Sequence, residues 1–276
     1  MGVFLMKVKI NNATKIITVW LKLLANGTYD PLIKVWSGPK GTRRHFLKGF
    51  KSDRNHHFLS DGEYRAGIYY ESLPKVIDYF EQFPLWDIEL AVRIANDMNI
   101  RYPMDKDGEA YVMSTDLFCR EYDPELKKIV KVAYTYKPLD SFDFNSKHPV
   151  SINRTLEKLE LERRYYFEKN IRFEIVTDAH ISKNCAHNLK AHRASAFYKD
   201  EFVEHEARFI NSFMDLWFAQ ENTSIRDHLA RLKPILGLGQ EDLMALFQWS
   251  IWTHQIPADL EIKINPFRPL LMKETA

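Results

Sequence analysis

The stretches VMSTD (residues 112–116), KVAYTYKP (131–138) and RTLEKLELERRYYF (154–167) decide the fold of this 276-residue chain. The first two alternate with period two, so each predicts a β-strand whose successive side chains point to opposite faces. Pro138 cannot donate to a central ladder and favours an extended residue before it, which places Lys137 at a strand end. The third stretch predicts a long helix, with Ser151 or Asn153 as its cap.

A carboxylate, Asp116, and Lys137 therefore lie on consecutive strands that a short connection joins. Metal-dependent nucleases assemble sites in this way, and the helix brings Glu157, Glu160 and Glu162 into the neighbourhood. The residues alone favour plainer interpretations, because a strand Asp near a strand Lys is more often a salt bridge. Glutamates among Arg and Lys likewise usually form a solvated helix face.

Segments before this stretch predict further elements of one α/β domain. Residues 13–25 predict an amphipathic helix that ends at Asn26-Gly27, with Ile16, Val19, Trp20 and Leu23 at helical spacing. Residues 76–83 alternate as a strand, residues 87–99 predict a helix, and residues 171–177 predict another strand.

The pattern changes after Asp178. Residues 200–220, 223–236 and 240–254 predict helices, and residues 259–265 predict a short strand. Three helices followed by a strand pair suggest a winged-helix-like module. Its third helix contains no Lys or Arg and begins with two acids, so we expect it to face protein. We therefore predict two domains, residues 1–178 and residues 179–276.

Composition limits the function classes. The formal net charge of +2 does not indicate nucleic-acid binding, so any DNA contact must come from local patches. Cys119 and Cys185 lack metal-ligand spacing, and the histidines form no zinc pattern. There is no phosphate-binding P-loop or serine-hydrolase motif. No signal peptide and no run of about 20 apolar residues is evident, so we expect a cytoplasmic protein without membrane contact.

Two upstream features leave alternatives open. Residues 34–57 are basic, and this segment is either a solvated loop or a surface that contacts the DNA backbone, where Lys and Arg neutralise phosphates. Ser60-x-x-Glu63 is a capping-box pattern, so the residues alone favour a structural role for Glu63. The candidates for DNA contact are Arg43, Arg44, Lys51, Arg54 and His57.

The three stretches, together with HHFLSDGE (residues 56–63) and EQFPL (81–85), resemble the TnsA family. These proteins are the endonuclease subunits of the heteromeric transposases of transposon seven and its relatives, including CRISPR-associated transposons. The resemblance covers roughly residues 33–178, and the run from Arg154 to Arg164 is its most specific part. It implies a restriction-endonuclease-like mixed-sheet core, which the order helix, strand, inserted helix, strand, strand, helix, strand also fits.

The resemblance implies a function as well. A bacterial protein of this family would be a Mg²⁺-dependent DNA endonuclease, with Mn²⁺ as a substitute, that cleaves the 5′ ends of a transposon. Its partners would be transposon-end DNA, a TnsB-like integrase and a TnsC-like AAA+ regulator. Glu63, Asp116 and the main-chain carbonyl of Tyr136 would bind the metal. Lys137 would orient water or stabilise phosphate charge, and Glu162, also counted among the catalytic residues, would hold an outer-shell water or the lysine.

One position departs from the family pattern. Thr135 occupies the place where most nucleases of this fold carry Glu or Gln, so the strand offers no side-chain ligand there. This departure supports an alternative function, a nuclease-fold adaptor with a degenerate site that recruits the TnsC-like regulator. A free-standing restriction or repair nuclease is a third possibility, although no sequence-reading element is evident.

Overall fold

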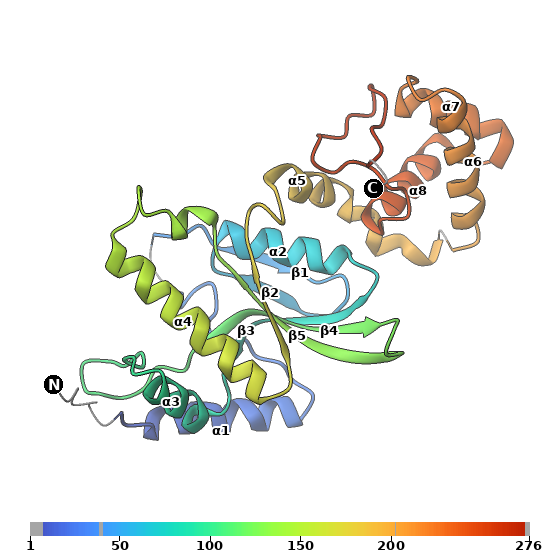
Figure 1. The fold of residues 1–276 in the computed structure, drawn as a ribbon. Coiled ribbons are helices and arrows are strands. Elements are labelled where there is room, and N and C mark those ends of the chain that lie inside the picture. Colours follow the sequence, from blue (N-terminus) through green and yellow to red (C-terminus); the bar gives the residue numbers. More distant parts are fainter. Residues whose placement is uncertain (1–7, 39–40, 202, 274–276) are drawn as a thin grey trace. The chain divides into compact units, whose positions relative to one another are not determined.

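The computed structural model describes residues 8–38, 41–201 and 203–273, which fall into two compact units. The first unit comprises Met1–Gly67 and Ile77–His180, and the second comprises Ile68–Val76 and Ile181–Ala276. No helix among the described residues is long and apolar enough to cross a membrane. Figure 1 shows the elements of both units.

A four-stranded mixed sheet forms the centre of the first unit, in the order β3-β4-β5-β6. Strand β4 pairs antiparallel with β5, with Leu117 opposite Tyr134, and β5 pairs parallel with β6. This sheet with its helices confirms the predicted α/β, restriction-endonuclease-like core. The strands are β3 (Val76–Pro84), β4 (Ser114–Asp123), β5 (Lys128–Tyr136) and β6 (Arg172–Val176).

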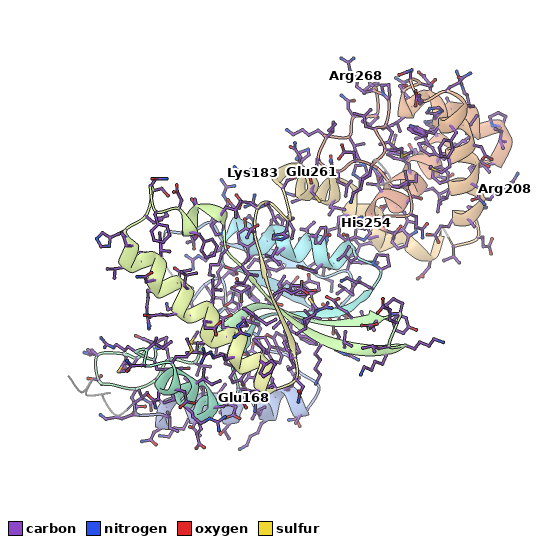
Figure 2. The ribbon with its side chains drawn as sticks, viewed as in Figure 1. Glu168, Lys183, Arg208, His254, Glu261 and Arg268 are labelled. Carbon is purple, nitrogen blue, oxygen red and sulfur yellow. The ribbon has the colours of Figure 1, made fainter. Side chains whose placement is uncertain are left out.

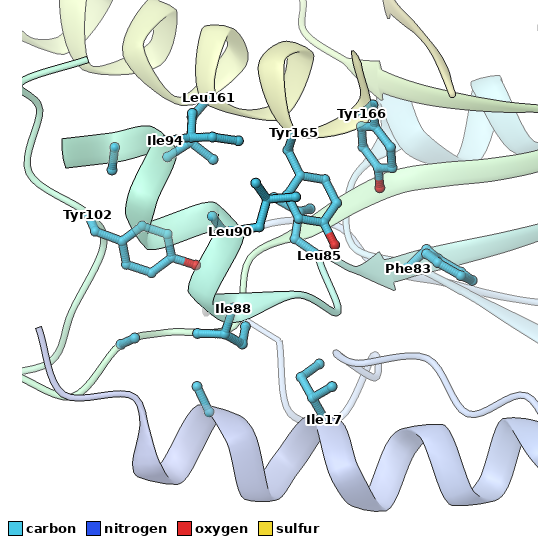
Figure 3. Close-up of a cluster of buried hydrophobic side chains, with 14 of the residues drawn as sticks. Ile17, Phe83, Leu85, Ile88, Leu90, Ile94, Tyr102, Leu161, Tyr165 and Tyr166 are labelled. Atoms are coloured by element: carbon cyan, nitrogen blue, oxygen red, sulfur yellow. The ribbon is translucent and has the colours of Figure 1, made fainter. Parts of the chain in front are cut away.

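Three helices and the sheet enclose the main hydrophobic core (Figure 3). They are α1 (Asn11–Ala25), α3 (Ile88–Asp97) and α4 (Pro149–Glu168). Helix α4 begins earlier than predicted, because Pro149 suits the first helical position and His148 accepts from the Val150 N–H. A short 3₁₀ turn, Leu139–Phe142, leads into it. The buried residues include Ile17, Phe83, Leu85, Ile88, Leu90, Ile94, Leu161, Tyr165 and Tyr166.

The buried face of α1 differs from the predicted one. Ala13, Ile17 and Trp20 are buried, whereas Ile16 and Val19 are 49% and 59% exposed. The helix is apolar on more than one side, so spacing alone fits two neighbouring faces. The Trp20 indole N–H donates to the Asp30 carbonyl at 2.8 Å, which fixes the face that turns inward.

The basic segment folds into a hairpin followed by a helix. Strands β1 (His45–Lys48) and β2 (Asn55–Phe58) pair antiparallel, and α2 (Asp61–Ser72) follows. Gly67 allows α2 to approach the hairpin, since an added Cβ would lie 2.3 Å from the Phe58 ring. The hairpin thus determines where α2, and with it Glu63, lies.

The second unit is helical. Its elements are α5 (Lys183–His192), the 3₁₀ segment Arg193–Glu201, α6 (Glu206–Ala219), α7 (Ile225–Leu236) and α8 (Gln240–Trp252). Phe209, Phe213, Leu229 and Phe247 are among its core residues. Figure 2 labels Arg208, whose guanidinium donates to the Ile235 carbonyl at 2.7 Å and so links α6 to the end of α7.

The predicted strand at residues 259–265 is wrong. The chain there turns irregularly, and the neighbouring pairing is limited to isolated bridges such as Ala258 with Met272. The buried Asn188 amide donates to the carbonyls of Leu260 and Ile262 and accepts from the Ile264 N–H. One side chain thereby satisfies backbone groups that a ladder would have paired. The winged-helix interpretation therefore stays a prediction.

Candidate active site

Asp116 and Lys137 meet where β4 and β5 run side by side. The Tyr136 N–H donates to Asp116 Oδ2 at 2.7 Å, and Lys137 Nζ lies 3.9 Å from the same oxygen. Lys137 Nζ also donates to the Tyr136 carbonyl at 3.0 Å. Burial raises the pKa of Asp116, while the Lys137 charge and the Tyr136 N–H act in the opposite direction. Burial alone would lower the pKa of Lys137. The negative charges of Asp116, Glu162 and Glu63 outweigh this effect and raise the pKa.

Glu63 comes to this pair from the first turn of α2. Burial and the nearby Asp116 charge raise the pKa of Glu63 to about 8, although hydrogen bonds and Lys137 favour its ionised form. Two carboxylates therefore share a partly desolvated site that contains one ammonium group. A divalent cation would relieve this repulsion, because opposite charge favours the ionised form of both acids.

Glu63 caps helix α2 and also places its carboxylate near Asp116. The Glu63 N–H donates to Ser60 Oγ at 3.1 Å, which is one half of a capping box. The Glu63 carboxylate accepts from Ser60 Oγ at 3.0 Å and from the Leu59 N–H at 2.8 Å. The same hydrogen bonds that begin the helix thus orient the carboxylate beside Asp116.

Glu162 reaches the site from α4 through Thr135. The Thr135 hydroxyl donates to Glu162 Oε2 at 2.6 Å and lies 2.9 Å from the Thr115 hydroxyl. Burial raises the pKa of Glu162 to about 7, with Thr135 and Lys137 opposing that effect. The carboxyl group that β5 lacks at position 135 is therefore supplied by the helix, one hydrogen bond away.

The donor chemistry fits a hard divalent cation. Glu63, Asp116 and the Tyr136 carbonyl offer oxygen atoms, and Mg²⁺ takes few protein ligands because it keeps several waters. Within residues 8–38, 41–201 and 203–273, no group of three or more His, Cys, Asp or Glu side chains forms a ready metal site. Two carboxylates would therefore bind the cation, and the Tyr136 carbonyl and water molecules would complete its coordination shell.

The Tyr136 ring joins the two ligand-bearing elements. An added Cβ on Gly62 would lie 2.0 Å from the Tyr136 ring, so only glycine allows this approach of α2 to β5. The Tyr136 hydroxyl accepts from Arg65 Nη2 at 2.9 Å, which fixes the ring on the same helix. Glu63 follows Gly62 directly and Lys137 follows Tyr136, so this contact sets their relative position. Sequence reasoning missed Gly62 and Arg65.

The five basic candidates for DNA contact lie in different environments. Arg43 is 76% exposed along its side chain and lies 3.8 Å from Asp61. Arg44 donates to the main-chain carbonyls of Val35 and Gly38. Lys51 is half-buried. Of these three, Arg43 is the most accessible to a phosphate.

The side chains of Arg54 and His57 are largely or fully buried beside the hairpin. Arg54 donates to Glu81 and stacks over the Tyr29 ring at 4.6 Å. His57 is buried beside Trp36, and burial lowers its pKa, so it is neutral near pH 7. The Arg54 side chain and the His57 main-chain N–H both donate to Glu81 of β3 and so hold the hairpin to that strand. A role of these residues in DNA contact stays a prediction.

Gln82 is a further residue that sequence reasoning missed. Its side chain is buried between β3 and α2 and donates to Glu63 Oε2 at 2.9 Å. The segment EQFPL carries it, but no charge or periodicity distinguishes an amide there. The feature that distinguishes Gln82 is its backbone conformation, with a φ of 51°, which is seen only in the structure.

Comparison with known proteins shows what this part of the chain is similar to. The family described as TnsA-like endonuclease N terminal matches residues 73–178, which include Asp116, Lys137 and Glu162. The protein named Transposon Tn7 transposition protein TnsA, from Escherichia coli, is 34% identical over 166 residues. That alignment covers 59% of this chain and 55% of the relative, so the chain spans about half the length of this relative. Residues 73–178 are thus similar to a TnsA-like endonuclease N-terminal domain, and the chain is similar to a transposition protein over 166 residues.

Proposed function

We propose that this chain is a Mg²⁺-dependent DNA endonuclease that cleaves the 5′ ends of a transposon. The observation that carries the proposal is the convergence of Glu63 and Asp116 with Lys137, whose ammonium lies 3.9 Å from Asp116. The similarity to a transposition protein supports transposon-end DNA as the proposed substrate. Two buried carboxylates repel each other, so the pair contributes little to the stability of the fold. The same arrangement favours the binding of a cation.

Each group has a distinct role in phosphodiester hydrolysis. Glu63, Asp116 and the Tyr136 carbonyl would hold Mg²⁺, with Mn²⁺ as a substitute, and the metal would supply charge neutralisation at the phosphate and an activated water. Lys137 stabilises the charge that grows on the phosphate, and its hydrogen bond to the Tyr136 carbonyl orients it. Glu162 holds Thr135 and balances the Lys137 charge from the helix side.

DNA is held chiefly by partners in this proposal. The formal net charge is +2, and of the basic candidates Arg43 offers the most exposed side chain. A TnsB-like integrase would cut and join the 3′ ends, and a TnsC-like AAA+ regulator would bind the second unit. The first turn of α8 in that unit carries Glu241 and Asp242, which suits a protein partner better than a DNA groove.

Strand-specific cleavage tests the proposal. A duplex carrying a transposon end is labelled on each strand and incubated with the chain, its TnsB-like partner and Mg²⁺. We expect the wild type to cut the 5′ strand and Asp116→Asn to cut it at least about 10²-fold more slowly, since the variant keeps the side-chain shape but loses the metal-binding charge.

The control is cleavage of the 3′ strand by the partner, which should proceed at the same rate with either chain. Circular dichroism should show the same helix content for both. Cutting of the 5′ strand by Asp116→Asn at the wild-type rate would contradict the proposal, as would wild-type cutting in excess EDTA.

A further inference from the structure

Gln82 lies within β3 in an unusual backbone conformation, and its side chain is hydrogen-bonded to Glu63. Its φ of 51° lies in the left-handed region, which non-glycine residues rarely adopt. Alternation along the strand is lost here, because Glu81, Gln82 and Phe83 are all buried. Glu81 contacts Arg54 and Phe83 joins the main core, so the strained residue directs its own side chain toward α2.

The Gln82 amide is held at both ends. Its Nε2 donates to Glu63 Oε2 at 2.9 Å, and its Oε1 accepts from the Ser114 hydroxyl at 3.0 Å. Ser114 begins β4, the strand that carries Asp116. The amide therefore joins the element of one candidate ligand to the element of the other.

The hydrogen bonds to Glu63 leave few positions open. A carboxylate has about four lone-pair positions, two on each oxygen. On Oε2, the Leu59 N–H and the Gln82 amide occupy both positions. On Oε1, Ser60 Oγ occupies one and a single position remains.

From this we infer that Gln82 is a positioning residue that saturates Glu63 Oε2 and so restricts Glu63 to binding a divalent cation through Oε1 alone. The inference rests on the proposed function, because it assumes that Glu63 is a ligand. Restriction to one oxygen fixes the orientation of the Glu63 carboxylate toward the cation. Partners that orient metal ligands in this way typically change metal affinity about 10–100-fold when they are removed.

Two variants of the full-length chain separate the hydrogen bond from the packing. Gln82→Met keeps similar length and volume without a donor, and Gln82→Glu keeps the acceptor for Ser114 but cannot donate to Glu63 when ionised. Mn²⁺ affinity is measured from the electron paramagnetic resonance signal of free Mn²⁺, without DNA or cleavage. We expect about 10-fold or greater loss of affinity in both variants, and a smaller loss in Ser114→Ala.

Tyr134→Phe is the matched control, because it deletes a buried hydrogen bond to Glu121 of 2.6 Å in the same sheet, away from Glu63. It should lower the melting temperature while leaving the Mn²⁺ affinity within twofold of wild type. Wild-type affinity in Gln82→Met, or increased affinity in Gln82→Glu, overturns the inference if Glu63→Gln still weakens binding. Equal binding by wild type and Glu63→Gln, or none by either, instead contradicts the metal role of Glu63 and removes the basis of the inference with it.

Discussion

Replacing Lys137 with alanine is expected to slow 5′-strand cleavage by about 10²–10³-fold, the usual loss when one preorganised charge-stabilising donor is removed. Lys137 lies 3.9 Å from Asp116 and is half-buried at the end of β5, so the change removes little packing. In the proposed division of labour, the TnsB-like partner would still join the 3′ ends. The 5′ strands would stay attached to the donor, and replication would yield cointegrates in place of simple insertions.

Long-read sequencing of insertion products from a complete transposition system measures this outcome. Lys128→Ala is a suitable control, because it removes an exposed lysine at the other end of the same strand. It should leave the proportion of simple insertions unchanged. The same proportion of simple insertions in Lys137→Ala as in wild type would mean that this chain does not make the 5′ cut.

Replacing Glu81 with alanine is expected to lower the free energy of unfolding of the first unit by about 3–5 kcal/mol, as removal of one partner from a buried ion pair does. Glu81 is fully buried and accepts from His56 Nδ1 at 2.8 Å and from Arg54 Nη1 at 2.9 Å. It also accepts from the His57 N–H at 3.0 Å. The variant would leave the Arg54 charge partly buried without its carboxylate.

Urea unfolding followed by circular dichroism measures this loss as a lower midpoint. The control is Glu157→Ala, which breaks a surface pair with Arg154 and should change stability by no more than about 0.5 kcal/mol. An unchanged midpoint in Glu81→Ala would show that the hairpin does not depend on this network.

The Glu81 network also has a defined pH dependence. Burial alone would raise the pKa of Glu81, but the hydrogen bonds and charges of His56 and Arg54 outweigh it and lower the pKa to about 2. A carboxyl with a depressed pKa stabilises the fold above its unfolded value, which is about 4.3, and this stability is lost as pH falls toward 2. Glu81→Ala should therefore lose less stability than wild type between pH 5 and pH 2.

The sheet and the long helix were predictable because their signals are local. Period-two alternation in residues 131–137 and Pro138 after it place Lys137 at the end of β5, where the structure has it. The same local reasoning failed at residues 259–265, where alternation is present but Asn188 satisfies the backbone groups. Periodicity reports which face is apolar, and it carries no information about a hydrogen-bonding partner some 70 residues away.

The surroundings of the candidate site were less predictable for a related reason. Arg54 and His57 are basic in sequence, but their environment depends on Glu81, which lies on another strand. Ser60 and Glu63 satisfy a capping pattern, and the pattern cannot reveal that Asp116 lies close to the same carboxylate.

Gln82 and Gly62 depend on backbone geometry that leaves no periodic trace. Gln82 has a left-handed φ, and Gly62 is required by the approach of the Tyr136 ring. Thr135 stood out in sequence as a missing ligand. Only the structure shows that its hydroxyl binds the helix carboxylate Glu162.

The central claim is that Glu63 and Asp116 jointly bind a divalent cation beside Lys137. Its most direct test is the anomalous scattering of Mn²⁺ in crystals of the full-length chain, with Asp116→Asn crystals as the comparison. The account predicts a peak within about 2.0–2.6 Å of Glu63 Oε1 and an Asp116 oxygen, the range of hard cations to oxygen ligands, and a weaker or absent peak in the variant. A peak that contacts neither carboxylate, or one of equal strength in Asp116→Asn, would contradict it.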